Sequence, residues 1–139
     1  MPTRDLGPHN AASHVDVDLA RPTFNELTAA MDFLQQGRAA LAEKCIDTAE
    51  RWARASAITL QTAENATGGP PEQTGFVITA EELRALHDSV RVALDYLHVG
   101  RVQDCLVATQ AAWRRAKVAT ECLEAAALIN AKGHAHVMH

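Results

Sequence analysis

One pattern of four residues occurs twice in this chain, and it constrains the fold more than any other feature. Thr48, Trp52, Ala55 and Thr59 recur 61 residues later as Thr109, Trp113, Ala116 and Thr120. Within each set the steps are 4, 3 and 4 residues, which places the four side chains along one side of an α-helix. Two such helices, each preceded by a similar segment, indicate a duplicated helical hairpin.

The repeat continues upstream of this pattern with an offset of 63 residues. Ala30, Met31, Asp32, Phe33, Leu34, Gly37 and Arg38 correspond to Ala93, Leu94, Asp95, Tyr96, Leu97, Gly100 and Arg101. Glycine tolerates the left-handed backbone conformation that often ends a helix. We therefore expect each glycine to end the first helix of its hairpin.

Composition favours an all-α protein of one domain. The chain has 139 residues, only 4% of them aromatic, and Ala, Leu, Val and charged residues dominate. Its net charge of −4 gives no general attraction to phosphate backbones, so no nucleic-acid partner is expected. No apolar run approaches the length of a membrane span, and the N-terminus lacks the apolar core of a signal peptide. We expect a cytoplasmic protein with no membrane partner, and the Ala-rich, Arg-over-Lys usage suggests a bacterial origin.

Glycine, proline and helix-capping residues divide the chain into five segments. An extended or disordered arm is expected over residues 1–22, the first hairpin over 23–64, a Gly- and Pro-rich linker over 65–78, the second hairpin over 79–131 and a His-rich tail over 132–139. Thr23 with Glu26 and Thr79 with Glu82 match the capping box that begins a helix. The long second helices are expected from Ala39 to about Glu64 and from Val102 to about Ala131, with Gly133 stopping the last one.

Four amphipathic helices joined by short turns predict an up-down four-helix bundle. Trp52 and Trp113 are expected to be its buried core anchors. The alternative is a stack of helical repeats, because the spacing of small and large residues resembles that of a tetratricopeptide repeat. The residues that carry this resemblance are Ala30, Phe33, Gly37, Ala42, Ile46 and Ala49, with Ala93, Tyr96, Gly100 and Cys105 as a partial second copy. The bundle is favoured because the long helices and the period between copies depart from that family.

Motifs that carry catalysis are lacking. The chain contains no GxSxG, HExxH or P-loop motif, and no Glu-x-x-His motif of the kind that builds di-metal bundles. We therefore predict that the protein is not an enzyme and uses no cofactor. Cys45, Cys105 and Cys122 lack CxxC spacing and are expected to be small, inert core residues.

Histidines provide the candidate ligand positions. His87 is the one ionisable residue on an apolar stripe, and we interpret it as a hydrogen-bonded core or interface residue. His134, His136 and His139 could bind a metal ion through their imidazoles, although a tail does not enforce a coordination geometry.

Arginines provide a candidate docking surface. Arg54 and Arg115 each follow a tryptophan by two residues and are expected to point away from the core. They form either a solvated face or, with Arg51 and Arg114, a surface that binds an acidic partner.

The unequal lengths of the expected helices suggest self-association, since a long apolar stripe would extend beyond a short neighbour. We expect a homodimer that also binds an unidentified protein. The favoured function is a non-catalytic protein–protein interaction module, such as an adaptor, a small chaperone or a regulatory subunit. The alternative is a bundle that binds a small ligand or a metal through His87, the cysteines or the His-rich tail.

Overall fold

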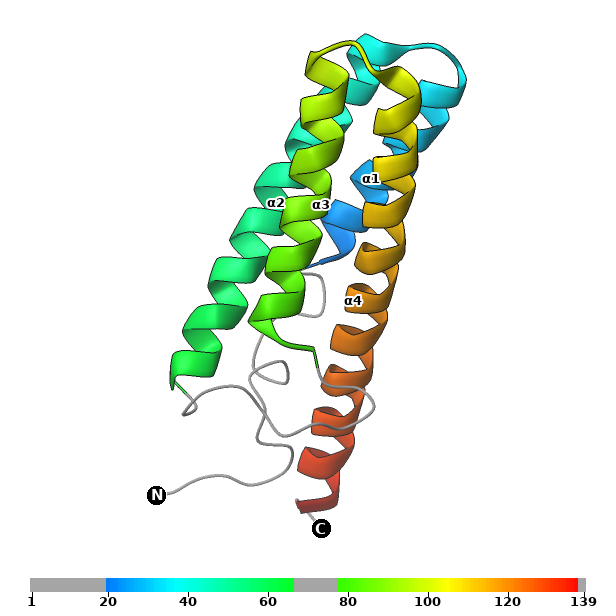
Figure 1. Ribbon diagram of the computed structural model, residues 1–139. Coiled ribbons are helices and arrows are strands. Elements are labelled where there is room, and N and C mark those ends of the chain that lie inside the picture. Colours follow the sequence, from blue (N-terminus) through cyan, green and yellow to red (C-terminus); the bar gives the residue numbers. More distant parts are fainter. Residues whose placement is uncertain (1–19, 67–77, 138–139) are drawn as a thin grey trace.

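The computed structural model is an all-α four-helix bundle, as the sequence predicts (Figure 1). It describes the backbone of residues 20–66 and 78–137, and the side chains of residues 20–66 and 78–128. The helices are α1 (Arg21–Gln35), α2 (Ala39–Ala66), α3 (Ala80–His98) and α4 (Val102–Val137). Each helix packs mainly against its two neighbours in the cyclic order α1, α2, α3, α4. Consecutive helices run in opposite directions in Figure 1, so the bundle has the up-down topology.

The two hairpin turns lie at the same end of the bundle, and α4 projects beyond the other helices at the opposite end (Figure 1). Gly37 and Gly100 adopt the left-handed conformation, with φ values of 75° and 80°, so both are confirmed as helix-ending residues. In each turn the backbone N–H of the arginine after the glycine donates to the backbone carbonyl of an aromatic residue: Arg38 to Phe33 at 2.8 Å and Arg101 to Tyr96 at 2.9 Å. Each guanidinium also lies over the ring of the same aromatic residue.

The two expected N-caps have different outcomes. Thr79 and Glu82 form the predicted capping box at the start of α3. The prediction for Thr23 is wrong, because the N-cap of α1 is Ala20, three residues earlier, and Pro22 lies in the first turn of the helix. Thr23 lies inside α1, where it is fully buried and its hydroxyl has no hydrogen-bond partner among the described residues.

Both long helices extend further than expected. α2 ends at Ala66, and α4 continues through Gly133 to Val137. A single glycine inside a helix costs about 1 kcal/mol relative to alanine, which good helix-forming neighbours offset. The expected stop at Gly133 is therefore wrong, and the segment containing His134 and His136 continues α4.

Burial follows the 63-residue offset along the whole repeat. In α2 the fully buried stripe is Ala42, Ile46, Ala49, Ala53 and Leu60; in α4 it is Cys105, Thr109, Ala112, Ala116 and Leu123. The 61-residue offset of the tryptophan pattern does not preserve burial, since Ala116 and Thr120 are buried whereas Ala55 and Thr59 are exposed. A difference of two residues rotates a side chain about 200° round a helix.

This rotation overturns one of the two expected core anchors. Trp52 is 44% exposed on α2, so the prediction that it is a buried anchor is wrong. Trp113 packs against the core from α4 and is partly buried. The two tryptophans do not occupy equivalent positions in the bundle.

The cysteines are free thiols: Cys105 is fully buried, and Cys45 and Cys122 are partly buried. Desolvation raises the pKa of all three thiols, which disfavours the reactive thiolate. Among the described residues, no helix combines the length and the apolar character needed to cross a membrane.

Candidate functional site

The 63-residue offset relates the two hairpins as approximate copies, so α1 corresponds to α3 and α2 to α4. The interface between α2 and α3 therefore corresponds to the interface between α4 and α1. At the matched positions, Glu50 and His87 in the first interface take the places of Trp113 and Phe24 in the second. The two interfaces use the same backbone positions for different chemistry.

The α1–α4 interface is aromatic. The Phe24 and Trp113 rings stack with their centroids 5.4 Å apart and an interplanar angle of 29°. The indole Nε1 of Trp113 donates to the Thr28 hydroxyl at 2.8 Å, and that hydroxyl donates to the Phe24 carbonyl at 2.9 Å. The ammonium of Lys117 lies 5.7 Å from the centroid of the Trp113 ring. These contacts satisfy the one polar atom of the indole within a mainly apolar contact.

The α2–α3 interface is ionic. Glu50 is only 3% exposed, and its carboxylate accepts hydrogen bonds from Arg54 Nη2 at 2.7 and 2.8 Å. The Nε2 atom of His87, on α3, lies 2.6 Å from Glu50 Oε2. A buried carboxylate is stable only when charged or hydrogen-bonded partners compensate for lost hydration. Arg54 and His87 supply that compensation from two different helices.

The electrostatics of Glu50 follow from this geometry. Burial alone would raise the pKa of Glu50, but hydrogen bonds from Arg54 and His87 outweigh it and lower the pKa below its usual value. The same contact raises the pKa of Arg54. Glu50 is therefore held as a carboxylate: its ion pair with Arg54 lies within α2, and its hydrogen bond with His87 joins α2 to α3.

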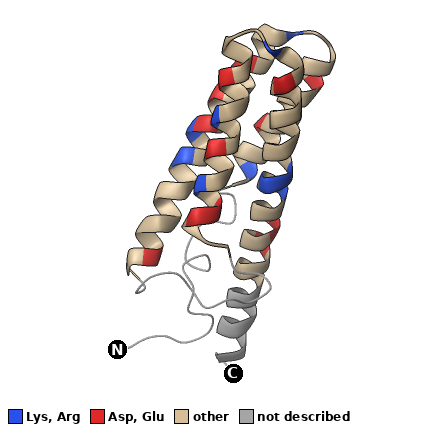
Figure 2. Cartoon of the chain, in the orientation of Figure 1, with Lys and Arg blue, Asp and Glu red and all other residues tan. Residues whose placement is uncertain are grey.

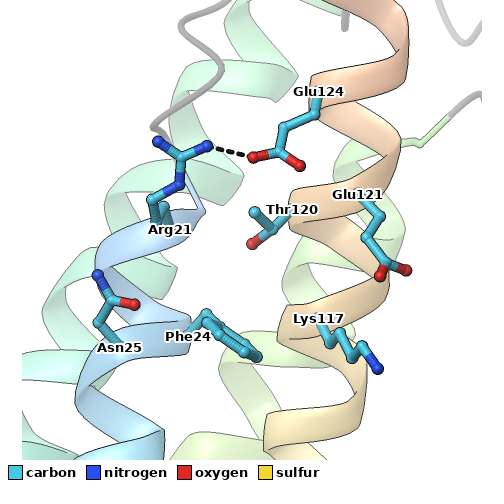
Figure 3. Close-up of a pocket in the computed structure, with 7 residues that line it drawn as sticks. All are labelled: Arg21, Phe24, Asn25, Lys117, Thr120, Glu121 and Glu124. Carbon is cyan, nitrogen blue, oxygen red and sulfur yellow. Dashed lines mark hydrogen bonds and ion pairs between the residues drawn. The ribbon is translucent and has the colours of Figure 1, made fainter.

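A cavity lies beside each interface. The α2–α3 cavity has a volume of about 320 Å³ and is lined by Arg54, Ala57, Ile58, Gln61, Thr62, Arg84 and His87. The α1–α4 cavity has a volume of about 250 Å³ and is lined by Arg21, Phe24, Asn25, Lys117, Thr120, Glu121 and Glu124 (Figure 3). Most of the lining positions correspond through the 63-residue offset, so these are two versions of one groove.

The arginine at the mouth of each groove has a different partner. In the α1–α4 groove Arg21 forms an ion pair with Glu124, drawn as a dashed line in Figure 3. In the α2–α3 groove the equivalent arginine, Arg84, donates instead to the neutral amide of Gln61. The α2–α3 groove is therefore richer in positive charge than its counterpart.

The expected docking arginines, Arg54 and Arg115, line different cavities. Arg54 is engaged by Glu50 at the α2–α3 interface. Arg115 is exposed on α4 and, with Arg114, lines a third cavity of about 290 Å³ whose other lining residues include Ile78 and Val118. Arg54 corresponds in the bundle to Lys117, and Arg115 to Trp52. The role of each arginine in binding a partner remains a hypothesis.

The histidine predictions divide in the same way. His87 lies at an interface and is hydrogen-bonded, as interpreted from the sequence. The side chains of His134, His136 and His139 lie outside the described residues, so the metal prediction for the tail stays a prediction. Within the part of the chain whose side chains are described, no group of three or more His, Cys, Asp or Glu residues could hold a metal ion.

Sequence reasoning missed Glu50. A signal was present, because the 63-residue offset pairs Glu50 with Trp113 and His87 with Phe24. Two polar residues that replace two aromatic residues at facing positions indicate a polar contact between the two helices. The 61-residue offset of the tryptophan pattern concealed this correspondence.

Comparison with known protein families, with curated proteins and with solved structures finds no match.

Proposed function

We propose that this protein is a non-catalytic helical interaction module that works as a homodimer, pairing through one side of α4. The observation that carries the proposal is a stripe with heptad spacing on the exposed side of this helix. The stripe consists of Val107, Ala111, Arg114, Val118, Glu121 and Ala125, at steps of 4, 3, 4, 3 and 4 residues. We call it the α4 stripe. Such spacing keeps side chains along one seam where a second helix can pack.

The α4 stripe is accessible and apolar at its ends and centre. Val107 is 64% exposed and Val118 is 53% exposed, although Thr109 and Ala116 on the opposite side of the helix are fully buried. No charged residue occurs between Asp104 and Arg114, and Figure 2 shows this part of α4 free of charge colour. Exposed branched side chains at heptad spacing are typical of a helix-docking surface.

The first hairpin does not repeat this feature. At the positions that correspond to Val107 and Val118, α2 carries Lys44 and Ala55. The valines are therefore not a by-product of the duplicated core pattern, which both hairpins share. This difference supports a contact made by the second hairpin alone.

The charges of the α4 stripe complement themselves in an antiparallel pair. If a two-fold axis passes near Val118, Arg114 of one copy lies at the level of Glu121 of the partner subunit. Ala111 then lies at the level of the partner's Ala125, and Val118 meets the partner's Val118. Apolar residues face apolar residues, and each arginine faces a glutamate. A homodimer is therefore the occupant that this surface fits best.

Two observations support the remaining parts of the proposal. The two buried carboxylates of the described residues, those of Glu50 and Glu64, both accept hydrogen bonds from α3, which suits a structural role better than catalysis. The three free thiols suit a reducing compartment such as the cytoplasm.

Sedimentation equilibrium across micromolar concentrations tests the dimer. We expect the wild-type chain to dimerise and Val118→Glu to weaken the dimer by about tenfold or more, because two glutamates would meet at the axis. Ile58→Glu is the matched control, since Ile58 is 60% exposed on α2 and lies outside the α4 stripe. A monomer at every concentration, or equal weakening by both variants, would refute the proposal.

A charge exchange tests the antiparallel pairing. Arg114→Glu should weaken the dimer, and adding Glu121→Arg should restore it, because each copy then presents the reversed pair to the other. Residues 114 and 121 are two helical turns apart and cannot pair directly within one helix. Failure of the double variant to restore association would exclude this geometry.

A further inference from the structure

The α2–α3 cavity carries an inference independent of the dimer. Its lining contains two guanidinium groups and one imidazole, from Arg54, Arg84 and His87. No carboxylate is among the described residues that line it, whereas the equivalent α1–α4 cavity is lined by Glu121 and Glu124. The two positions concerned are Ile58 and Gln61 in the α2–α3 cavity. The two positions that are glutamates in the α1–α4 groove are therefore uncharged residues in the α2–α3 groove.

Among the described residues, the charge balance of this cavity leaves one guanidinium, that of Arg84, without an acidic partner. Glu50 lies behind the cavity and offsets the charge of Arg54. Arg84 is bonded to the neutral Gln61 side chain. In the other groove Glu124 neutralises Arg21, and the Figure 3 view shows Glu121 and Lys117 extending away from α1. Of these two equivalent grooves, the α2–α3 groove is therefore the one with a surplus positive charge.

The remaining lining residues indicate the size and polarity of a ligand that the cavity could hold. Ala57 and Ile58 supply aliphatic surface next to the arginines. A volume of about 320 Å³ is at the small end of the range of ligand pockets. One surplus charge matches a monoanion better than a phosphate monoester, which carries about −1.5 to −2 charges at neutral pH. A planar carboxylate also matches the fork of a guanidinium group.

We propose that the α2–α3 cavity binds a small organic carboxylate with a short aliphatic chain. The carboxylate lies between Arg84 and Arg54 and displaces the Gln61 amide from Arg84. The aliphatic chain packs on Ala57 and Ile58. The Glu50–His87 pair holds the back wall of the cavity and keeps Arg54 in place.

Isothermal titration calorimetry of the full chain tests the ligand class, with hexanoate, acetate and inorganic phosphate as probes. We expect saturable binding of one hexanoate per chain, with acetate about tenfold weaker because it lacks the aliphatic chain. Phosphate binding as tight as that of hexanoate would overturn the choice of a carboxylate. Lack of saturable binding by hexanoate would overturn the site itself.

An exchange between the two grooves tests the location. Gln61→Glu copies the Arg21–Glu124 ion pair into the α2–α3 groove and should weaken hexanoate binding by about tenfold or more, since the new carboxylate occupies Arg84. The variant adds an ion pair and keeps the size of the side chain, so it should fold like the wild type, which circular dichroism checks. Glu124→Gln should leave binding at the α2–α3 site unchanged. Unchanged binding in Gln61→Glu, or equal loss in both variants, would refute the location.

Discussion

The α1–α4 and α2–α3 interfaces occupy equivalent places in the bundle but are stabilised by different interactions. Phe24 and Trp113 bury aromatic surface in one, whereas in the other the buried Glu50 carboxylate pairs with Arg54 and is hydrogen-bonded to His87. A backbone geometry that accepts either pair shows that the hairpin repeat itself determines the helix arrangement. The side chains at this level then determine what each groove can bind.

Energetically the two solutions are not equivalent. Aromatic burial contributes directly to stability, because it removes apolar surface from water. A buried ion pair must first offset the cost of desolvating its charges, and its net contribution is often small. Removing one member of the ion pair is nevertheless costly, because the other stays buried without a partner.

The largest expected effect separates the two tryptophans. Trp113→Ala should lower the free energy of unfolding by about 3 kcal/mol, because the indole stacks on Phe24 and packs on the core. Trp52→Ala should lower it by a smaller amount, about 1 kcal/mol, because Trp52 is 44% exposed. Urea denaturation followed by circular dichroism measures both. Equal losses would mean that the two hairpins bury their tryptophans alike, contrary to the 63-residue correspondence.

This contrast shows where sequence reasoning succeeded and why it failed elsewhere. The helices and turns are local: Gly37, Gly100 and the Thr79–Glu82 box determine them within a few residues, and all were predicted. By contrast, the local sequence does not determine which side of α2 faces the core. It depends on whether the packing follows the 61-residue offset or the 63-residue offset between the hairpins. The tryptophans favoured the 61-residue offset, but the exposed Trp52 and the partly buried Trp113 do not occupy equivalent positions.

The candidate site was less predictable than the fold for the same reason. His87 stood out as a polar residue on an apolar stripe, but its partner Glu50 follows Ala49 in a helix rich in charged residues. Only the pairing of α2 with α3 brings them within 2.6 Å. Burial of Thr23 was also unpredictable, because its spacing to Glu26 matches a cap equally well.

Substitutions at His87 and Glu50 would make the α2–α3 interface resemble the apolar α1–α4 interface. His87→Phe places the residue found at position 24 into the second hairpin and should destabilise the protein by about 2 kcal/mol, because Glu50 loses one partner. Adding Glu50→Leu should return stability to within about 1 kcal/mol of the wild type, since both polar partners are then replaced together. A double-mutant cycle by thermal or urea denaturation measures the coupling. Additive losses would show that His87 and Glu50 do not interact.

A smaller effect is expected at Thr23, which corresponds to Leu86 in the second hairpin. The Thr23 hydroxyl is buried and has no partner among the described residues, whereas Leu86 at the matched place is apolar. Thr23→Val keeps the side-chain shape and removes the unsatisfied hydroxyl, so it should stabilise the protein by about 1 kcal/mol. Thr79→Val is the contrasting control, because Thr79 caps α3 and its loss should destabilise. Destabilisation by both substitutions would indicate that the Thr23 hydroxyl is satisfied after all.

The smallest expected effect concerns acid, and it distinguishes the ionic interface from the aromatic one. The pKa of Glu50 is lowered on folding, so its contribution to stability is present above the unfolded pKa of about 4.3 and is lost as pH falls toward the folded pKa. Glu50→Gln cannot ionise. The stability difference between the wild type and this variant should therefore shrink as pH is lowered from about 5 to about 3, while the corresponding difference for Trp113→Ala stays constant. Urea midpoints at each pH measure both differences, and the acid response shared by the other carboxylates cancels in them. A Glu50→Gln difference that grows in acid would mean that folding raises the pKa of this carboxyl, and that the α2–α3 interface buries it without adequate compensation.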